Sequence, residues 1–126
     1  MKKGKVLGIF PEGGITSVKL TKAKPGAVFI ASRANTQILP VSVSGGDNAW
    51  DDLFKGVRSR IIVNIGKPFG PLEITGTKDD KTSKLDNYSK ELMCRIAALL
   101  PDDRHGEYSN DNSIVRYRDE NQLDLF

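Results

Sequence analysis

A glutamate followed by two glycines comes shortly after the first apolar stretch of the chain, and this combination is suited to an anionic ligand. Glu12, Gly13 and Gly14 follow the run KVLGIF at residues 5–10. Glycines let successive backbone N–H groups approach an anion closely, and a nearby lysine such as Lys24 supplies positive charge for a phosphate. The Glu12 carboxylate could accept a hydrogen bond from a hydroxyl group of the same ligand. On these residues alone, an ordinary turn with a solvated glutamate is the more frequent explanation.

The positive charge of the chain is concentrated in its first quarter. Residues 1–33 hold seven lysines and arginines against Glu12 alone, a net charge of +6, whereas residues 34–126 sum to −3. Such a segment suits phosphate esters, anionic lipid surfaces or nucleic acid, and charge alone does not choose among them. Solvated surface lysines are the plain alternative.

Length and composition bound the architecture. A chain of 126 residues and 13.9 kDa fits one small domain, and 38% apolar residues allow a modest core. No apolar stretch reaches the ~20 residues of a membrane-spanning helix, and residues 6–10 are too short for a signal peptide. We expect a cytoplasmic protein, and its basic segment is compatible with a peripheral position on the inner face of the membrane. Cys94, the single cysteine, excludes an internal disulfide and metal binding by paired thiolates.

Strand and helix patterns alternate along the chain and predict an α/β fold. Ser83 with Asp86 resembles a capping box, and apolar residues at helical spacing follow as far as Leu99, before Pro101. A strand, a helix and a second strand at the start predict a parallel crossover. The polar residues 102–126 are expected to be poorly ordered, or ordered only near their start. The other predicted elements are strands at 5–10, 38–44 and 59–69, a helix at 24–35 and a short helical turn at 49–56.

Three segments together resemble the phospholipid and glycerol acyltransferase family, of the lysophosphatidate acyltransferase type. They are residues 8–16 (GIFPEGGIT), residues 24–27 (KPGA) and residues 38–43 (ILPVSV). The resemblance extends to about residue 108, where Arg104, Gly106 and Tyr108 look like the close of such domains. It implies that residues 1–108 are the C-terminal part of a three-layer αβ acyltransferase domain with a mostly parallel or mixed sheet, followed by a polar, flexible tail at 109–126.

The resemblance also implies an activity and a set of binding residues. Enzymes similar to 1-acylglycerol-3-phosphate acyltransferase move a fatty acyl group from acyl-CoA or acyl-carrier protein to a hydroxyl of a lysophospholipid or glycerol phosphate. The acyl donor is a co-substrate, and no other cofactor or metal is implied. By this resemblance the substrate-binding residues are Phe10, Pro11, Glu12, Gly13, Gly14, Lys24 and Pro40.

Two departures from the family pattern limit this interpretation. The family's reaction uses a histidine and an aspartate four residues apart, whereas the one histidine here, His105, has Asn110 five positions on. No catalytic residue is therefore predicted in this chain, which we expect to be an inactive fragment whose upstream half carries that pair. Gly14 and Ile15 stand where the family often has threonine and arginine, so the acceptor is the least defined substrate.

A non-catalytic binding module is the alternative function. It would meet an anionic ligand through residues 1–33, or a bacterial sliding clamp through the last five residues, which are similar to the clamp-docking pentapeptide of replication and repair proteins. That pentapeptide is Gln122, Leu123, Asp124, Leu125 and Phe126.

The remaining candidates are assigned to structure. Basic residues near a predicted strand, Arg58 and Arg60, lack an aromatic-interleaved signature and are treated as surface charges, so no nucleic-acid partner is predicted. Trp50 and Phe54 are expected in the core in preference to an acyl groove. Cys94 is expected to be a packed thiol.

Overall fold

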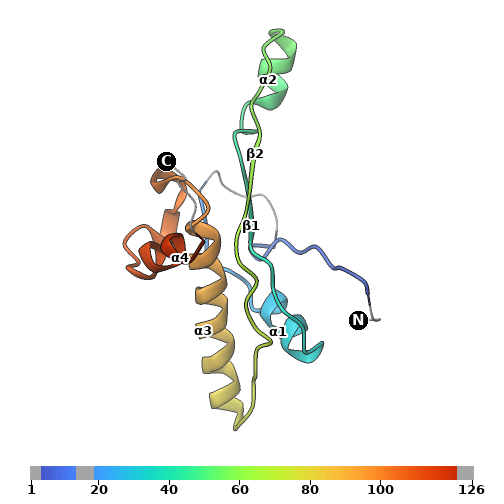
Figure 1. Cartoon of the computed structure of the whole chain (residues 1–126), viewed down its shortest axis with the longest axis vertical. Helices are drawn as coiled ribbons and strands as arrows, with labels where there is room; N and C mark the ends of the chain where they lie inside the picture. The colour runs from blue at the N-terminus through green and yellow to red at the C-terminus, as the bar shows by residue number, and fades with distance from the viewer. Residues whose placement is uncertain (1–3, 14–18, 122–126) are drawn as a thin grey trace.

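One long helix organises the chain in the computed structural model, which describes residues 4–13 and 19–121 (Figure 1). Gly14 and residues 122–126 lie outside the described residues. The elements in chain order are α1 (Gly26–Arg33), β1 (Val41–Ser44), α2 (Ala49–Phe54), β2 (Ile62–Ile65), α3 (Lys78–Ala97), the 3₁₀ helices η1 (Asp102–Arg104) and η2 (Gly106–Tyr108), and α4 (Ser113–Asn121). The fold is mixed α/β. The helices predicted at 24–35 and 49–56 are confirmed as α1 and α2.

The long helix α3 begins earlier than the sequence predicts. Its capping box is formed by Thr77 and Asp80 and not by Ser83 and Asp86: the Thr77 hydroxyl accepts from the Asp80 N–H at 3.2 Å, and the Asp80 carboxylate accepts from the Thr77 N–H at 3.0 Å. Two reciprocal bonds satisfy backbone donors at the helix start. A threonine and an aspartate three residues apart are as good a cap as the serine pair, so the earlier pair sets the boundary.

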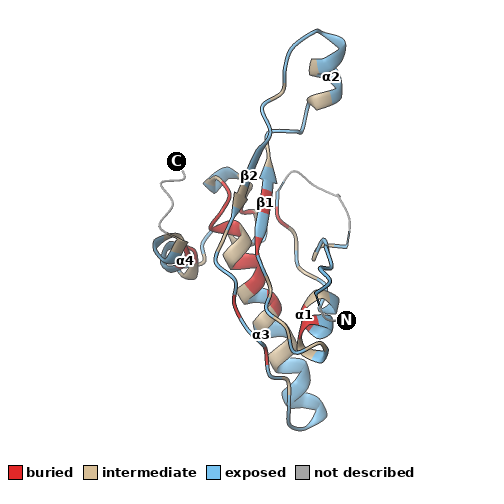
Figure 2. Ribbon diagram, turned by 45° about the vertical axis from the view of Figure 1, so that its right-hand side comes forward, coloured by how far each residue is buried: buried red, intermediate tan, exposed pale blue. Residues whose placement is uncertain are grey.

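Two apolar clusters pack against α3, and its buried half lies toward its C-terminal end (Figure 2). Between them, the Arg95 guanidinium lies 4.5 Å from the Phe69 ring centre and 4.4 Å from that of Tyr117. Because the planar cation stacks on both rings, it joins the two clusters. The first cluster is Leu20, Met93, Cys94, Ala97, Ala98, Leu100, Ile114 and Tyr117, and the second is Val28, Phe69, Leu72 and Leu92.

The sheet found among the described residues is an antiparallel hairpin of two strands. The predicted parallel crossover is wrong, because its first strand, residues 5–10, does not form. β1 pairs with β2 in the register Val41 with Ile65 and Val43 with Val63. Pro40 precedes β1, where its missing N–H breaks no ladder bond, and its carbonyl accepts from Gly66 at 2.9 Å. A pair of hydrogen bonds between Ile38 and Phe69 extends the pairing in the same direction. The part of the chain that the structure describes does not confirm the expected three-layer domain.

The hairpin turns its polar face toward the protein. Ser42 on β1 and Asn64 on β2 both donate to the carbonyl oxygen of Leu99, each at 3.0 Å, just beyond the end of α3. The opposite face carries exposed valine and isoleucine side chains. Apolar and polar side chains therefore alternate along the strands, and the apolar ones face outward because Ser42 and Asn64 satisfy the Leu99 carbonyl oxygen beyond the helix end.

Residues 5–10, predicted to be a buried strand, have no regular secondary structure and are exposed. In Figure 1 this segment extends away from the helices. An isolated strand leaves its backbone groups unpaired and is not stable in water without a neighbour. Within residues 4–13 and 19–121, no strand pairs with it, which explains the difference.

The C-terminal region is more structured than its polar composition predicts. Helix α4 packs against α3 through buried Ile114 and Tyr117. Two apolar residues spaced three apart are enough to anchor a short helix on a neighbour, although residues 102–126 were expected to be poorly ordered.

None of the described helices combines the length and the apolar composition that crossing a membrane requires.

The Asp111 carboxylate connects α3 to the start of α4, and we predict that Asp111→Asn destabilises the fold. Hydrogen bonds from Ser113, with a smaller effect of Lys90 at 3.3 Å, lower the pKa of Asp111 from 3.8 to about 2. A folded-state pKa below the unfolded one means that the stabilisation is complete above about pH 4 and is lost as the pH falls through 2. Urea unfolding should show a loss of about 1 kcal/mol at pH 7.

The same measurement at pH 2 should show little difference between the two proteins. A difference that stays constant from pH 7 to pH 2 would show that the carboxylate charge does not stabilise this junction.

Candidate functional site

The Phe-Pro-Glu-Gly sequence forms a tight turn. The Gly13 N–H donates to the Phe10 carbonyl at 3.0 Å, which closes a four-residue turn with Pro11 in its second position. Proline favours that position because its φ is already fixed, and Gly13 takes a φ of +81°, which favours glycine. The residue types of this segment therefore determine its shape.

A second set of contacts joins this turn to residues 21–24. The Glu12 carboxylate accepts from the backbone N–H of Thr21 at 2.9 Å and from its hydroxyl at 2.8 Å. The Lys24 N–H donates to the Pro11 carbonyl at 2.8 Å. We name residues 10–13 together with 19–24 the Glu12 loop. Its closure places two segments on either side of residues 14–18 against each other.

The Lys24 side chain lies over the turn. A Cβ atom built on Gly13 would come within 2.8 Å of the Lys24 ammonium nitrogen and 2.9 Å of its Cδ and Cε. Glycine at position 13 thus leaves room for the lysine beside Glu12. The structure brings together four of the residues predicted from sequence, namely Pro11, Glu12, Gly13 and Lys24.

The other predicted residues are placed differently. Phe10 starts the turn but its ring is exposed, and Gly14 lies outside the described residues. Pro40 is buried at the start of the hairpin, where a Cβ on Gly66 would be 3.2 Å from its ring. Its contacts belong to the hairpin and not to the Glu12 loop.

Residues near the C-terminus hold the Glu12 loop in place. Gly106, with a φ of +56°, lets η2 approach so closely that any Cβ there would overlap the Leu20 carbonyl. The Leu20 N–H donates to the Arg104 carbonyl at 3.0 Å, and the Tyr108 hydroxyl accepts from the Ala23 N–H at 3.4 Å. Arg104, Gly106 and Tyr108 stand out in the sequence through the family resemblance, but the sequence does not indicate their contact with residues 20–23.

Thr21 is the residue of this site that sequence analysis missed. It pairs with Glu12 nine positions earlier, and no regular periodicity joins residues at that distance across a loop. Nothing in the sequence indicates that this threonine, and not a neighbouring polar residue, meets the carboxylate.

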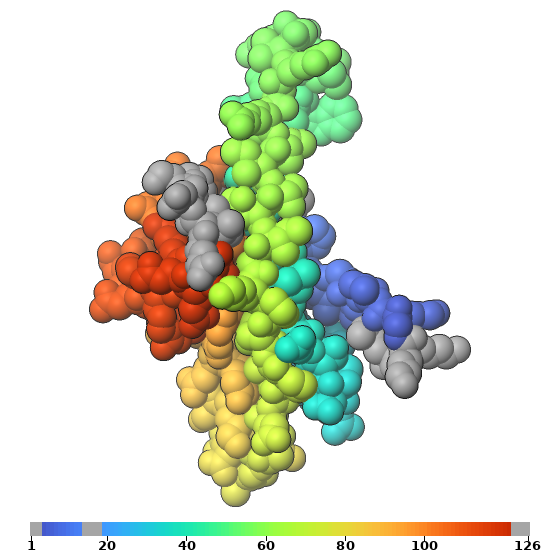
Figure 3. Space-filling model, in the orientation of Figure 1, coloured from blue at the N-terminus to red at the C-terminus, as the bar shows by residue number. Residues whose placement is uncertain are grey.

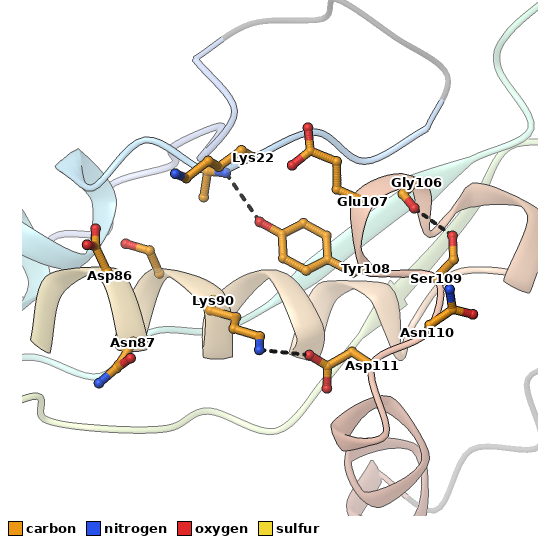
Figure 4. Close-up of a pocket in the computed structure, with 12 residues that line it drawn as sticks. Lys22, Asp86, Asn87, Lys90, Gly106, Glu107, Tyr108, Ser109, Asn110 and Asp111 are labelled. Carbon is orange, nitrogen blue, oxygen red and sulfur yellow. Dashed lines mark hydrogen bonds and ion pairs between the residues drawn. The ribbon is translucent and has the colours of Figure 1, made fainter. Parts of the chain in front are cut away.

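A cavity of about 550 Å³ adjoins the Glu12 loop between α3 and η2 (Figure 4). Tyr108 and the Lys22–Ala23 segment form one side, and Lys90, paired with Asp111, lies on another. Two ammonium groups and three carboxylates line it, so the cavity carries no excess of positive charge. A phosphate is better matched by the turn beside Lys24 than by this cavity.

His105 has a structural position. It is buried, and its Nε2 lies 3.2 Å from the Leu100 carbonyl oxygen and 3.3 Å from Arg118. An imidazole held among these groups is not presented to a substrate. That His105 is not the catalytic base stays a prediction. Across residues 4–13 and 19–121, no group of histidine, cysteine and carboxylate side chains could hold a metal ion.

Comparison with known proteins bears on the segment that contains the Glu12 loop. Residues 1–44 match the family model described as Acyltransferase. The resemblance to phospholipid and glycerol acyltransferases is confirmed over this N-terminal part, and the match supports a general acyltransferase role. No curated protein and no solved structure matches the chain.

The clamp interpretation of residues 122–126 concerns residues outside the described part of the chain and stays a prediction.

Cys94 should be chemically inert in the folded protein. Its side chain is 1% exposed, and burial, followed by the nearby Asp111 carboxylate, raises the pKa of the thiol from 9.0 to about 12. A thiol with this pKa is protonated at pH 8 and is a poor nucleophile. We predict no reaction with Ellman's reagent at pH 8 in buffer and one equivalent of reaction in urea.

Ser83→Cys is a suitable control, because it adds a thiol at an exposed position of α3. This variant should react once in buffer. Rapid labelling of the unmodified chain would mean that Cys94 is accessible and remains a candidate nucleophile.

Proposed function

We propose that this chain supplies the acceptor-binding part of an acyltransferase that moves a fatty acyl group from acyl-CoA or acyl-carrier protein to a hydroxyl of a lysophospholipid or glycerol phosphate. The observation that carries the proposal is the match of residues 1–44 to the acyltransferase family, because this range includes Phe10 to Gly13 and Lys24. The closed geometry of the Glu12 loop supports it.

The loop offers complementary groups for a phosphate ester with a free hydroxyl. The Lys24 ammonium group beside Gly13 provides a positive charge for the phosphate, and the basic first 33 residues raise the local concentration of anions. The Glu12 carboxylate, oriented by Thr21, is an acceptor for the hydroxyl proton. Binding and orientation are the tasks that these residues can perform.

The chemical step requires a group that this chain does not present. When an acceptor oxygen attacks the thioester carbonyl carbon, the hydroxyl proton must be taken up and the thiolate released. The single histidine, His105, is buried between η1 and η2. The base would therefore come from another polypeptide segment.

Binding of the acceptor is the direct test. We predict that the 126-residue chain binds glycerol 3-phosphate and short-chain lysophosphatidate in calorimetric titrations, and that Lys24→Gln weakens this binding about tenfold through loss of one charge-assisted contact. Glu12→Gln should weaken binding less, because its amide oxygen can still accept from Thr21.

Lys81→Gln is the matched control: it removes the same charge from an exposed position near the start of α3 and should leave binding unchanged. The chain alone should release no thiol from acyl-CoA. Equal affinities of the Lys24 and Lys81 variants would refute the proposed phosphate contact, and thiol release by the chain alone would contradict the assignment of the base to another segment.

A further inference from the structure

The hairpin carries α2 at its far end, away from the helical body. Figures 1 and 3 show this segment projecting beyond α1, α3 and α4. None of the residues of α2 is buried. We name residues 49–61 the α2 tip. Because no residue of this six-residue helix is buried, its apolar side chains do not contribute to the core. Their presence at the surface therefore calls for another explanation.

The large apolar residues of α2 share one side of the helix. Trp50, Leu53 and Phe54 have the spacing i, i+3 and i+4 of a single helix face, and Val57 follows beyond the helix end. Their exposed fractions are 76%, 65%, 86% and 56%. The sequence-based expectation that Trp50 and Phe54 lie in the core is therefore wrong: the chain reverses beyond β1 and carries both away from it.

Basic side chains follow directly after this face. Lys55, Arg58 and Arg60 are all exposed, and they outnumber the carboxylates of the same segment, Asp51 and Asp52. The Asp52 carboxylate also accepts a hydrogen bond from Ser59 at 2.6 Å. Asp47, at the base of the tip, is paired with Arg104. The projecting end thus combines an apolar face with a net positive charge.

Local hydrogen bonds give the α2 tip a defined shape. The Val57 N–H donates to the Asp52 carbonyl at 2.8 Å, and the Gly56 N–H donates to that of Leu53 at 3.1 Å. Gly45, with a φ of +87°, allows the hairpin to narrow where a Cβ would overlap the Arg60 carbonyl. The side chains are therefore presented on an ordered turn.

We propose that the α2 tip docks on the surface of an anionic lipid bilayer. Trp50, Leu53 and Phe54 enter the headgroup region, where tryptophan is favoured, while Lys55 and Arg58 meet lipid phosphates. A convex, projecting end fits a deformable surface without a matching pocket, and the positive charge complements anionic headgroups. The inference does not depend on the acyltransferase proposal, because the tip lies outside residues 1–44.

Trp50 is the single tryptophan of the chain and reports directly on this contact. The full chain is titrated with phosphatidylcholine vesicles and with vesicles containing phosphatidylglycerol as well. We expect a blue shift of the tryptophan emission, and quenching by lipids with brominated acyl chains, with the anionic vesicles only. Phe54→Ser should weaken binding by at least about tenfold.

Val115→Ser is the matched control, because it removes a 64% exposed apolar side chain from α4 and should bind like the unmodified chain. Replacing Lys55, Arg58 and Arg60 by glutamine should abolish the preference for anionic vesicles while leaving the circular dichroism spectrum unchanged.

Two results would overturn the proposal. Sedimentation with vesicles without any change in Trp50 emission would show that another segment, such as the basic residues before position 33, makes the contact. A blue shift that depends on protein concentration in the absence of lipid would show that a second protein molecule covers the tip.

Discussion

The fold depends on one constraint: the backbone carbonyl groups just beyond the end of α3 have no partner within the helix and must be hydrogen-bonded by other parts of the chain. The last carbonyls of any α-helix lack partners within the helix, and burial makes their satisfaction obligatory. Here the Leu99 oxygen is bonded by Ser42 and Asn64 of the hairpin, whereas the Leu100 oxygen is bonded by Arg118 of α4 at 2.8 Å and contacted by His105. The hairpin, η1 and α4 are all held by the same two peptide groups.

The contacts around the end of α3 explain why the two proposed functional segments lie apart. Because serine and asparagine must face the helix end, the hairpin presents valine and isoleucine outward and carries the α2 tip clear of the core. The Glu12 loop is held on the other side by η2, through Gly106 and Tyr108. The acyltransferase-like segment and the lipid-docking segment are thus separate parts of the chain that are anchored on one scaffold.

Local patterns were sufficient to predict most elements, but not their partners. Apolar residues at helical spacing after Pro25 located α1, the glycines after Pro11 located the Glu12 turn, and β-branched residues located both strands. The predicted parallel crossover was wrong because residues 5–10 form no strand and β1 pairs with β2 instead. The alternation Val41-Ser42-Val43 is the same whichever side faces the core, and the Leu99 carbonyl decides which side does. Within the site, Glu12 and Lys24 could be predicted from the motif and from their charge. Thr21 could not, because no spacing rule indicates that it meets the Glu12 carboxylate nine residues away.

The outward-facing hairpin also has a thermodynamic consequence. The chain exposes 9003 Å² of surface, whereas a compact monomer of 13.9 kDa exposes about 6,700 Å². Less apolar surface is therefore left to become hydrated when the chain unfolds, and the heat capacity change of unfolding scales with that surface. We therefore expect this chain on its own to have a flatter stability curve and a broader thermal transition than compact domains of its length, and we expect a surface that covers the hairpin to increase its cooperativity.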